Sequence, residues 1–165
     1  MLIRPEIEQD WPSIAAVVGT AFRQAEHSDG NEAAVVAALR GDGALALSLV
    51  AIAERALAGH VAFSKVTVPG AQGQWFGLGP LSVLPRLQSR GIGAALVHEG
   101  LEHLRRNSAA GCTVLGEPDY YRRFGFSSDP ALTFGGQADR HFQRLVFQGP
   151  APCGDAVYHR AFMET

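Results

Sequence analysis

The 165-residue chain is poor in the features that mark several common classes of protein. It has 2 cysteines and a formal net charge of −2 at pH 7. Two cysteines are too few for a disulfide framework, and the lack of a basic excess gives no electrostatic footprint for nucleic acid. Because Cys112 lies in an apolar run, we expect it to be a buried free thiol and the protein to be cytoplasmic.

Long apolar runs and leader features are also lacking. The longest apolar stretch, at about residues 44–53, is too short to cross a bilayer. The first residues show neither the basic start nor the apolar segment of a secretory leader. We therefore expect no membrane partner and no nucleic-acid partner, and instead a small molecule or a peptide.

Several motifs that carry chemistry are absent. No P-loop occurs, and the third glycine of a dinucleotide-binding fingerprint would fall at Leu96. His98 and His103 lie about 140° apart around a helix, so they cannot share a face as metal ligands. There is no G-x-S-x-G segment. We expect no metal and no covalent enzyme intermediate.

Residues 83–97 form the most informative stretch of the chain. An apolar run ends at Pro85, a polar bend containing Gly91 and Gly93 follows, and an amphipathic helix then begins. Glycines let backbone N–H groups approach a ligand closely, and the helix dipole adds partial positive charge there. The stretch favours binding of an anion, above all a phosphate. A tight turn that packs a helix on a strand is the alternative.

The pattern of elements predicts a mixed α+β fold in one domain of residues 1–165. The expected elements are a strand at 2–4, helices at 11–24 and 32–39, strands at 45–53, 59–68 and 75–83, a helix ending near Asn107, a strand at 112–115, a short helix capped by Asp119 and ended by Gly125, and strands at 142–148 and 155–162. The strand, helix and strand from 75 to 115 predict a parallel pair. Gly79 and Pro80 predict a kink at 77–82.

Two short motifs give the chain a family resemblance. Residues 88–93 read Q-S-R-G-I-G, and residues 121–126 read Y-R-R-F-G-F. They match the [Q/R]-x-x-G-x-[G/A] and Y-x-x-x-G-F segments of the GCN5-related N-acetyltransferases. Residues 115–121, L-G-E-P-D-Y-Y, further resemble a bacterial subgroup of predicted acetyltransferases. The order of elements agrees too, so the resemblance covers nearly the whole chain.

This resemblance implies a fold and a cofactor. The fold is a twisted, mostly antiparallel sheet of about seven strands with a parallel, splayed fourth and fifth strand, flanked by about four helices. The cofactor is acetyl-CoA, with its pyrophosphate on backbone amides of 88–94 and its pantetheine arm beside Leu81 and Val83. For these two side chains, core packing is the alternative. The implied cofactor-binding residues are Leu81, Val83, Gln88, Ser89, Arg90, Gly91, Ile92, Gly93 and Ala94.

The implied activity is that of an N-acetyltransferase. A primary amine attacks the thioester directly in a ternary complex, and Tyr121 protonates the departing thiolate, since a phenol with a pKa of about 10 keeps its proton at neutral pH. Tyr120 competes for this role, because neighbours on a helix point about 100° apart. A core aromatic is the alternative role for Tyr121.

The residue that deprotonates the amine is left open by the sequence. Strand 75–83 contains no acid and no histidine. The candidates are Ser82 as a proton relay, Glu117 as a base, and Asp119, His27 and Asp29. The working hypothesis is a path through water.

The acceptor is an amine of a small molecule, peptide or protein, and segments 25–31, 133–141 and 148–155 are expected to select it. Because members of the family often dimerise, a homodimer is also open. The alternative functions are a non-catalytic acyl-CoA-binding or sensor protein, transfer of another acyl group, and transfer to oxygen.

Overall fold

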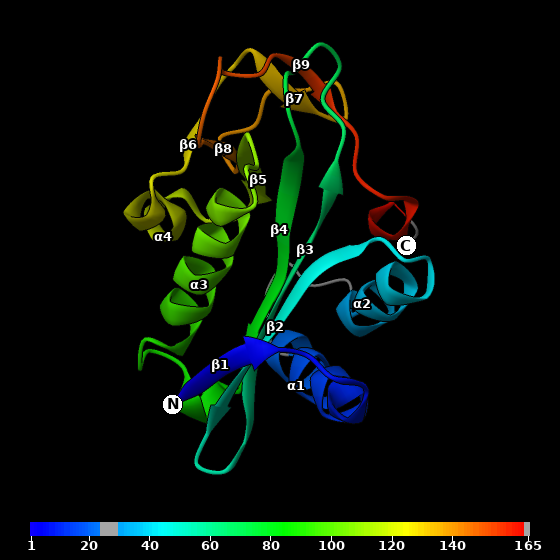
Figure 1. Cartoon of the computed structure of the whole chain (residues 1–165), viewed down its shortest axis with the longest axis vertical. Helices are drawn as coiled ribbons and strands as arrows, with labels where there is room; N and C mark the ends of the chain where they lie inside the picture. Colours follow the sequence, from blue (N-terminus) through cyan, green and yellow to red (C-terminus); the bar gives the residue numbers. More distant parts are fainter. Residues whose placement is uncertain (24–29, 164–165) are drawn as a thin grey trace.

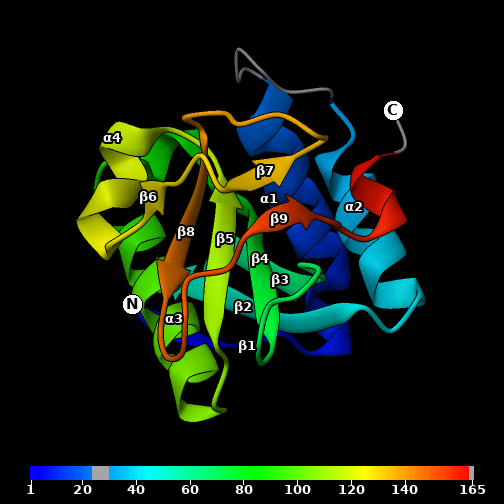
Figure 2. The ribbon, with the colours of Figure 1, turned by 90° about the horizontal axis from the view of Figure 1, so that it is seen from above.

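A seven-stranded sheet runs through the molecule, and helices cover both of its faces (Figure 1, Figure 2). The computed structural model describes residues 1–23 and 30–163. In chain order, with η for a 3₁₀-helix, the elements are β1 (Leu2–Pro5), η1 (Glu8–Asp10), α1 (Trp11–Arg23), α2 (Glu32–Gly41), β2 (Leu45–Ala53), β3 (Ala56–Val66), β4 (Trp75–Val83), η2 (Pro85–Leu87), α3 (Ile92–Arg106), β5 (Gly111–Leu115), α4 (Pro118–Tyr121), η3 (Arg122–Phe124), β6 (Ser127–Ser128), β7 (Leu132–Phe134), β8 (Phe142–Val146), β9 (Gly154–Ala156) and η4 (Arg160–Phe162).

The two faces of the sheet follow from the alternation of side chains along each strand. On β2, Leu47 and Leu49 face α3 and join a core cluster that includes Leu96. Val50, the residue after Leu49, points to the opposite face and packs with Ile14 of α1. As Figure 2 shows, α3 therefore lies on one face, and α1 and α2 lie on the other.

The sheet order is β1-β2-β3-β4-β5-β8-β6, and its one parallel pair is β4 with β5 among the residues that the structure describes. This confirms the predicted mixed fold with a mostly antiparallel sheet and a parallel fourth and fifth strand. The parallel pairing ends at Leu78 opposite Val114, whereas β4 continues to Val83. Because β5 ends at Leu115, one residue later, the second half of β4 has no strand paired to that edge among the described residues.

The predicted kink in β4 is confirmed. The pairing of β3 with β4 jumps from Val61–Leu81 to Phe63–Leu78, so Gly79 and Pro80 form a bulge. The peptide bond between these two residues is cis. The bulge lies where β4 leaves β5.

Two local predictions are wrong, and two short strands were not expected. The predicted strand 155–162 is shorter, because β9 ends at Ala156 and the His159 side chain accepts a hydrogen bond from the Ala161 amide at the start of η4. Asp119 does not cap the short helix, because Pro118 fits its first turn and Glu117 occupies the cap position. The short strands β6 and β7 were not predicted, and β7 pairs with β9 in a separate two-stranded sheet.

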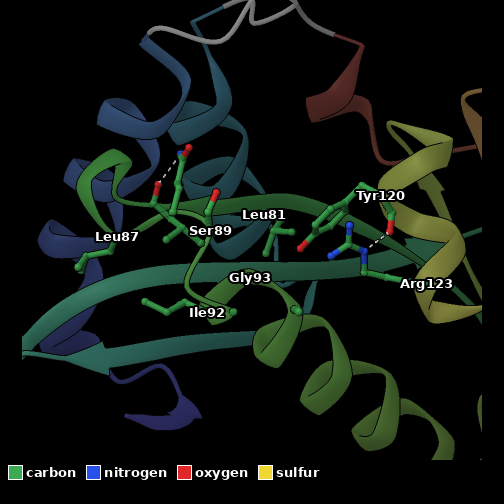
Figure 3. Close-up of a pocket in the computed structure, with 11 residues that line it drawn as sticks. Leu81, Leu87, Ser89, Ile92, Gly93, Tyr120 and Arg123 are labelled. Carbon is green, nitrogen blue, oxygen red and sulfur yellow. Dashed lines mark hydrogen bonds between the residues drawn. The ribbon is translucent and has the colours of Figure 1, made fainter.

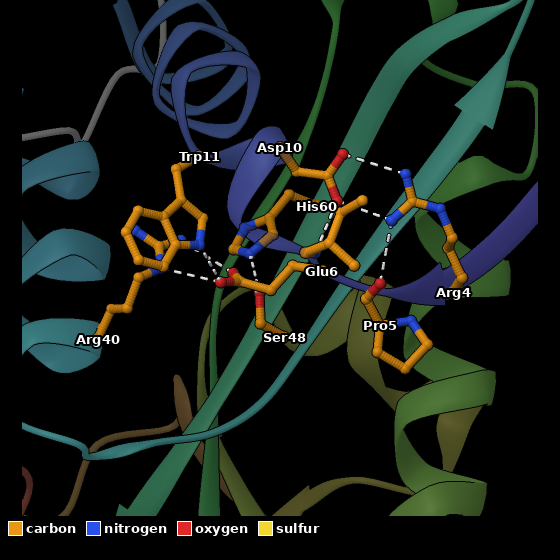
Figure 4. Close-up of polar contacts among 9 residues, drawn as sticks. Arg4, Pro5, Glu6, Asp10, Trp11, Arg40, Ser48 and His60 are labelled. Carbon is orange, nitrogen blue, oxygen red and sulfur yellow. Dashed lines mark hydrogen bonds and ion pairs between the residues drawn. The ribbon is translucent and has the colours of Figure 1, made fainter.

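A polar cluster joins five elements beneath α1 and α2 (Figure 4). The Glu6 carboxylate, just after β1, accepts hydrogen bonds from Arg40 at 2.9 Å, from Trp11 at 2.8 Å and from the Ser48 hydroxyl. Ser48 in turn lies 2.8 Å from Nε2 of His60, which is fully buried on β3. These bonds lower the pKa of Glu6, against the effect of burial. The cluster fixes β1 and both helices onto the sheet.

Candidate functional site

The turn from β4 into α3 presents a row of backbone donors. Gly91, at the N-cap of α3, has a φ of +86°, in the left-handed region that glycine adopts without strain. The first helical bond joins the Ala95 amide to the Gly91 carbonyl at 3.0 Å. The amides of residues 92–94 precede it and have no acceptor within the helix. The Gln88 side chain donates to the Val83 carbonyl at 3.1 Å and ties the loop to β4.

These donors open into a cavity of about 590 Å³ between β4, α3 and α4 (Figure 3). The residues that line it are Leu81, Val83, Leu87, Gln88, Ser89, Gly91, Ile92, Gly93, Ala94, Tyr120 and Arg123. Eight of the nine sequence-predicted cofactor residues are in this set, and Arg90 is the exception. The structure therefore brings the predicted loop and the end of β4 together around one cavity.

The chemistry of this cavity suits a phosphate-bearing ligand. A Cβ atom on Gly93 would lie 3.1 Å from the Tyr120 hydroxyl, so a side chain there would narrow the cavity beside the free amides. The described residues of the lining include no acid, and Arg123 adds a guanidinium. Helix N-termini bind anions through such donors and through the helix dipole. The residues present fit the pyrophosphate expected from the sequence.

Arg123, Leu87 and Tyr120 line the cavity although none was a predicted cofactor residue. The Arg123 guanidinium stacks 4.4 Å from the centre of the Tyr120 ring, and its Nε donates to the Tyr120 carbonyl at 2.8 Å. Tyr120 at the end of α4 and Arg123 in η3 are three residues apart, and this spacing was the available signal, because residues three apart in a helical segment share a face. Arg90 instead lies outside the cavity lining, where its exposed side chain is 3.7 Å from Glu54.

The two adjacent tyrosines have different surroundings. The Tyr120 side chain points into the cavity (Figure 3). The Tyr121 ring packs edge-on against Phe126 and against Gly116, where a Cβ would lie 2.4 Å from the ring. Burial raises the pKa of Tyr121 well above its usual value, helped by the nearby Cys112. Tyr121 thus keeps its proton at neutral pH, beside the end of β5.

The three candidate bases that the structure describes, Ser82, Glu117 and Asp119, do not line the cavity. Ser82 is buried with no hydrogen-bond partner among the described residues, and it is paired in register with His60. Glu117 and Asp119 are exposed, at 3.8 Å from His141 and 3.5 Å from Arg122 respectively. The other two candidates, His27 and Asp29, lie outside the described residues. Among the described residues, the structure therefore brings the predicted cofactor residues together around this cavity and none of the candidate bases.

Residues 1–23 and 30–163 contain neither a metal-binding group nor a membrane-spanning helix. Over those ranges, no group of three or more His, Cys, Asp or Glu residues is placed to hold a metal ion. No helix in the same ranges is long and apolar enough to cross a membrane. Cys112 is buried and free, and burial raises the pKa of its thiol.

Comparisons with known proteins agree with this geometry. A family model described as an acetyltransferase (GNAT) domain matches residues 3–128. The uncharacterized N-acetyltransferase YhbS of Escherichia coli K12 is 43% identical over 127 residues, which are 76% of this chain and 73% of YhbS.

Two solved structures are similar over nearly the whole chain. A GNAT family acetyltransferase from Brucella melitensis in complex with acetyl-CoA has a TM-score of 0.86 at 45% identity, covering 98% of this chain and 97% of that one. E. coli YhbS in complex with CoA has a TM-score of 0.89 at 35% identity, covering 99% and 92%. Both similar proteins were thus solved with a coenzyme A ligand.

Proposed function

Because the chain belongs to the acetyltransferase (GNAT) domain family, we propose that it is an acetyl-CoA-dependent N-acetyltransferase that acts on a primary amine. The observation that carries the proposal is the set of free amides at the start of α3, which open into the cavity beside Leu81 and Val83. The coenzyme A ligands of the two similar proteins support it.

In this proposal the chain holds the cofactor mainly with its backbone. The amides of residues 92–94 bind the pyrophosphate, and Arg123 adds a positive charge at the same end of the cavity. Because β5 ends at Leu115, the edge of β4 from Gly79 to Ser82 pairs with no strand among the described residues, and we propose that an extended amide-bearing arm pairs there. Leu81 and Val83 supply the apolar wall along that arm.

The proposed chemistry is direct transfer in a ternary complex. Acetyl-CoA supplies the thioester: the C–N bond to the amine forms, the C–S bond breaks, the amine loses a proton and the sulfur gains one. Tyr121 is the proposed donor of the proton to sulfur, because its ring lies beside Gly116 at the end of β5, further along the gap than the amides. Tyr120, with its hydroxyl beside Gly93, is proposed to contact the cofactor near the phosphates.

The amine's proton is proposed to leave through water. Within residues 1–23 and 30–163, no acid or histidine lines the cofactor cavity, and the exposed Glu117 lies 3.8 Å from His141. An amine with a pKa of about 10 is mostly protonated at neutral pH, so kcat/KM is expected to rise with pH over the range where the free amine accumulates.

The experiment is a binding and turnover assay with matched glycine variants. Calorimetry measures the Kd for acetyl-CoA, and thiol release measures transfer to a panel of amines. Gly93→Val brings atoms against the Tyr120 hydroxyl and is expected to raise Kd and KM for acetyl-CoA about tenfold, which is about 1.4 kcal/mol. Gly19→Val is the control, because Gly19 is also helical and has nothing within 4 Å of its Cβ position.

The outcomes separate the candidate functions. Failure to bind acetyl-CoA refutes the proposal, and binding without thiol release for any amine supports an acyl-CoA sensor instead. We further propose that residues 1–165 form one domain that works in the cytoplasm, which the free thiols of Cys112 and Cys153 support.

A further inference from the structure

We propose that Tyr158 sets the size of the acyl group that the protein transfers and restricts it to acetyl. The inference rests on the proposed acetyltransferase function and deepens it, because it concerns the acyl donor. Tyr158 follows β9 in the chain, and its ring lies over Gly77 of β4. A Cβ atom on Gly77 would lie 2.6 Å from Cε2 of this ring and 2.9 Å from Cγ2 of Val66. The ring therefore occupies the space that a side chain at position 77 would need.

The Tyr158 ring is held from several sides. Its hydroxyl lies 2.5 Å from the Thr113 hydroxyl on β5. Its ring centre lies 5.2 Å from that of Phe134 of β7 and 5.4 Å from that of Phe162 of η4, and both contacts are edge-on. The ring cannot turn aside without breaking the hydrogen bond or these aromatic contacts. Tyr158 is therefore a rigid block on this face of the sheet.

This block lies at the closed end of the gap beside β4. In the proposed binding mode, the cofactor enters at the start of α3 and its arm runs along the edge of β4 toward the bulge. The first pair of β4 with β5 that the arm reaches is Leu78 with Val114. The next pair is Gly77 with Thr113, which the Tyr158 ring covers. An acyl carbon beyond the thioester carbonyl thus points at this covered pair.

A longer acyl chain has to turn toward one face of the sheet, because the paired strands block the way ahead. On the α3 face, Leu78, Val114 and Phe126 belong to the core cluster and are each at most 5% exposed. On the opposite face, Pro80 of the bulge and Tyr158 border the same space, so a chain that turns this way meets the Tyr158 ring. Extra methylene groups in packed surroundings force strain on the side chains around them. Acetyl, with a single carbon beyond the carbonyl, is the group that fits.

The first test compares acyl donors in the thiol-release assay, with the amine of the panel that reacts fastest with acetyl-CoA. One methylene in an apolar pocket changes kcat/KM by a factor of about 10 to 200. We therefore expect kcat/KM to fall about tenfold from acetyl-CoA to propionyl-CoA and about 100-fold from acetyl-CoA to butyryl-CoA. Equal kcat/KM for acetyl-CoA and butyryl-CoA overturns the proposal.

The second test separates the Tyr158 ring from its hydroxyl. Tyr158→Leu shortens the side chain, and it is expected to reduce the preference for acetyl-CoA over butyryl-CoA about tenfold. Tyr158→Phe keeps the ring and is expected to keep the preference. Thr113→Val removes the partner of the hydroxyl while the ring stays, so its preference is expected to lie between those of the other two variants. An unchanged preference in Tyr158→Leu overturns the assignment, and so does a preference lost equally in Tyr158→Phe.

Phe147→Ala is the matched control for the loss of an aromatic side chain. Phe147 is partly buried and stacks on Arg105 of α3, on the opposite face of the sheet from Tyr158. The variant is expected to keep the preference for acetyl-CoA. A preference lost to the same extent as in Tyr158→Leu would mean that general loosening of the fold causes the change, and it overturns the specific role of Tyr158.

A binding measurement keeps this inference separate from the activity. Calorimetry without an amine is expected to give a Kd for butyryl-CoA about tenfold above that for acetyl-CoA, and Tyr158→Leu is expected to remove the difference. If acetyl-CoA binds and no amine is acetylated, the transferase function fails, while equal Kd values for the two donors would still overturn the role of Tyr158. If acetyl and butyryl groups are transferred equally well, the role of Tyr158 fails and the transferase function stands.

Discussion

The buried imidazole of His60 is expected to make the protein sensitive to mild acid. Ser48 has one hydroxyl proton, and it donates that proton to the Glu6 carboxylate. The Ser48 oxygen must then accept from His60, so His60 carries its proton on Nε2. Nδ1 of His60 is buried with no hydrogen-bond partner among the described residues. Protonation would therefore place a charged, unpaired N–H in the interior.

The structure also gives the size of the effect. Burial, with a smaller contribution from Arg40 and against the attraction of Glu6, lowers the pKa of His60 from 6.5 to about 4. Between these two values the unfolded chain binds a proton that the folded chain does not, so stability falls as pH falls. Each pH unit between these two pKa values is worth about 1.4 kcal/mol, so the free energy of unfolding is expected to fall by about 3 kcal/mol between pH 6.5 and 4.

The assay is urea denaturation at a series of pH values for the protein and for His60→Gln. Glutamine keeps a donor for Ser48 but cannot titrate, so the variant is expected to be less stable at pH 7 and to lose about 3 kcal/mol less on acidification. His98→Gln, at an exposed position on α3, controls for the loss of one imidazole from the unfolded chain. A His60→Gln profile that keeps the full loss between pH 6.5 and 4 would refute the reasoning.

Other variants test residues at the cofactor cavity and in the polar cluster around Glu6. Tyr121→Phe is expected to lower kcat about 100-fold with KM for acetyl-CoA unchanged, whereas Tyr120→Phe raises that KM; steady-state kinetics with the opposite split contradicts the assignment. Arg123→Gln is expected to weaken CoA binding in calorimetry, more at low salt than at high salt, and the exposed Arg122→Gln to leave it unchanged. Glu6→Gln leaves a largely buried guanidinium without its carboxylate, so urea denaturation is expected to show a loss of about 2 to 4 kcal/mol; an unchanged midpoint argues against this.

The elements that the sequence predicts well are long and periodic. The helix after Gly91 and the three strands between residues 45 and 83 have enough alternating or helically spaced apolar residues to identify them. Strands β6 and β7 are 2 and 3 residues long, too short to carry a period. The end of the chain was predicted wrongly because its backbone follows a local bond, from the Ala161 amide to the His159 ring, and not the apolar pattern.

The turn at residues 88–94 could be predicted because its backbone geometry requires glycine, and glycine positions are visible in the sequence. Gly91 has a left-handed φ and Gly93 leaves room beside Tyr120. A second cavity, of about 280 Å³, could not be predicted in this way, because its aromatic rings come from α1, β7, β8, η4 and the segment after β9. Only the folded chain brings Phe22 and Phe162 to one space, so no local spacing between them could have been recognised.

The bulge in β4 lies between the two cavities, and the alternation of side chains along the strand explains why β4 borders both of them. Beyond the bulge at Gly79 and Pro80, side chains alternate between the faces, so Val83 faces α3 and the neighbouring Ser82 does not. Because β5 ends at Leu115, the backbone groups on that edge of β4 beyond Leu78 pair with no strand in the described part of the chain. A regular β4 paired with β5 along its whole length would consume those groups and close the gap. The irregularity is therefore what allows one strand to border two separate cavities.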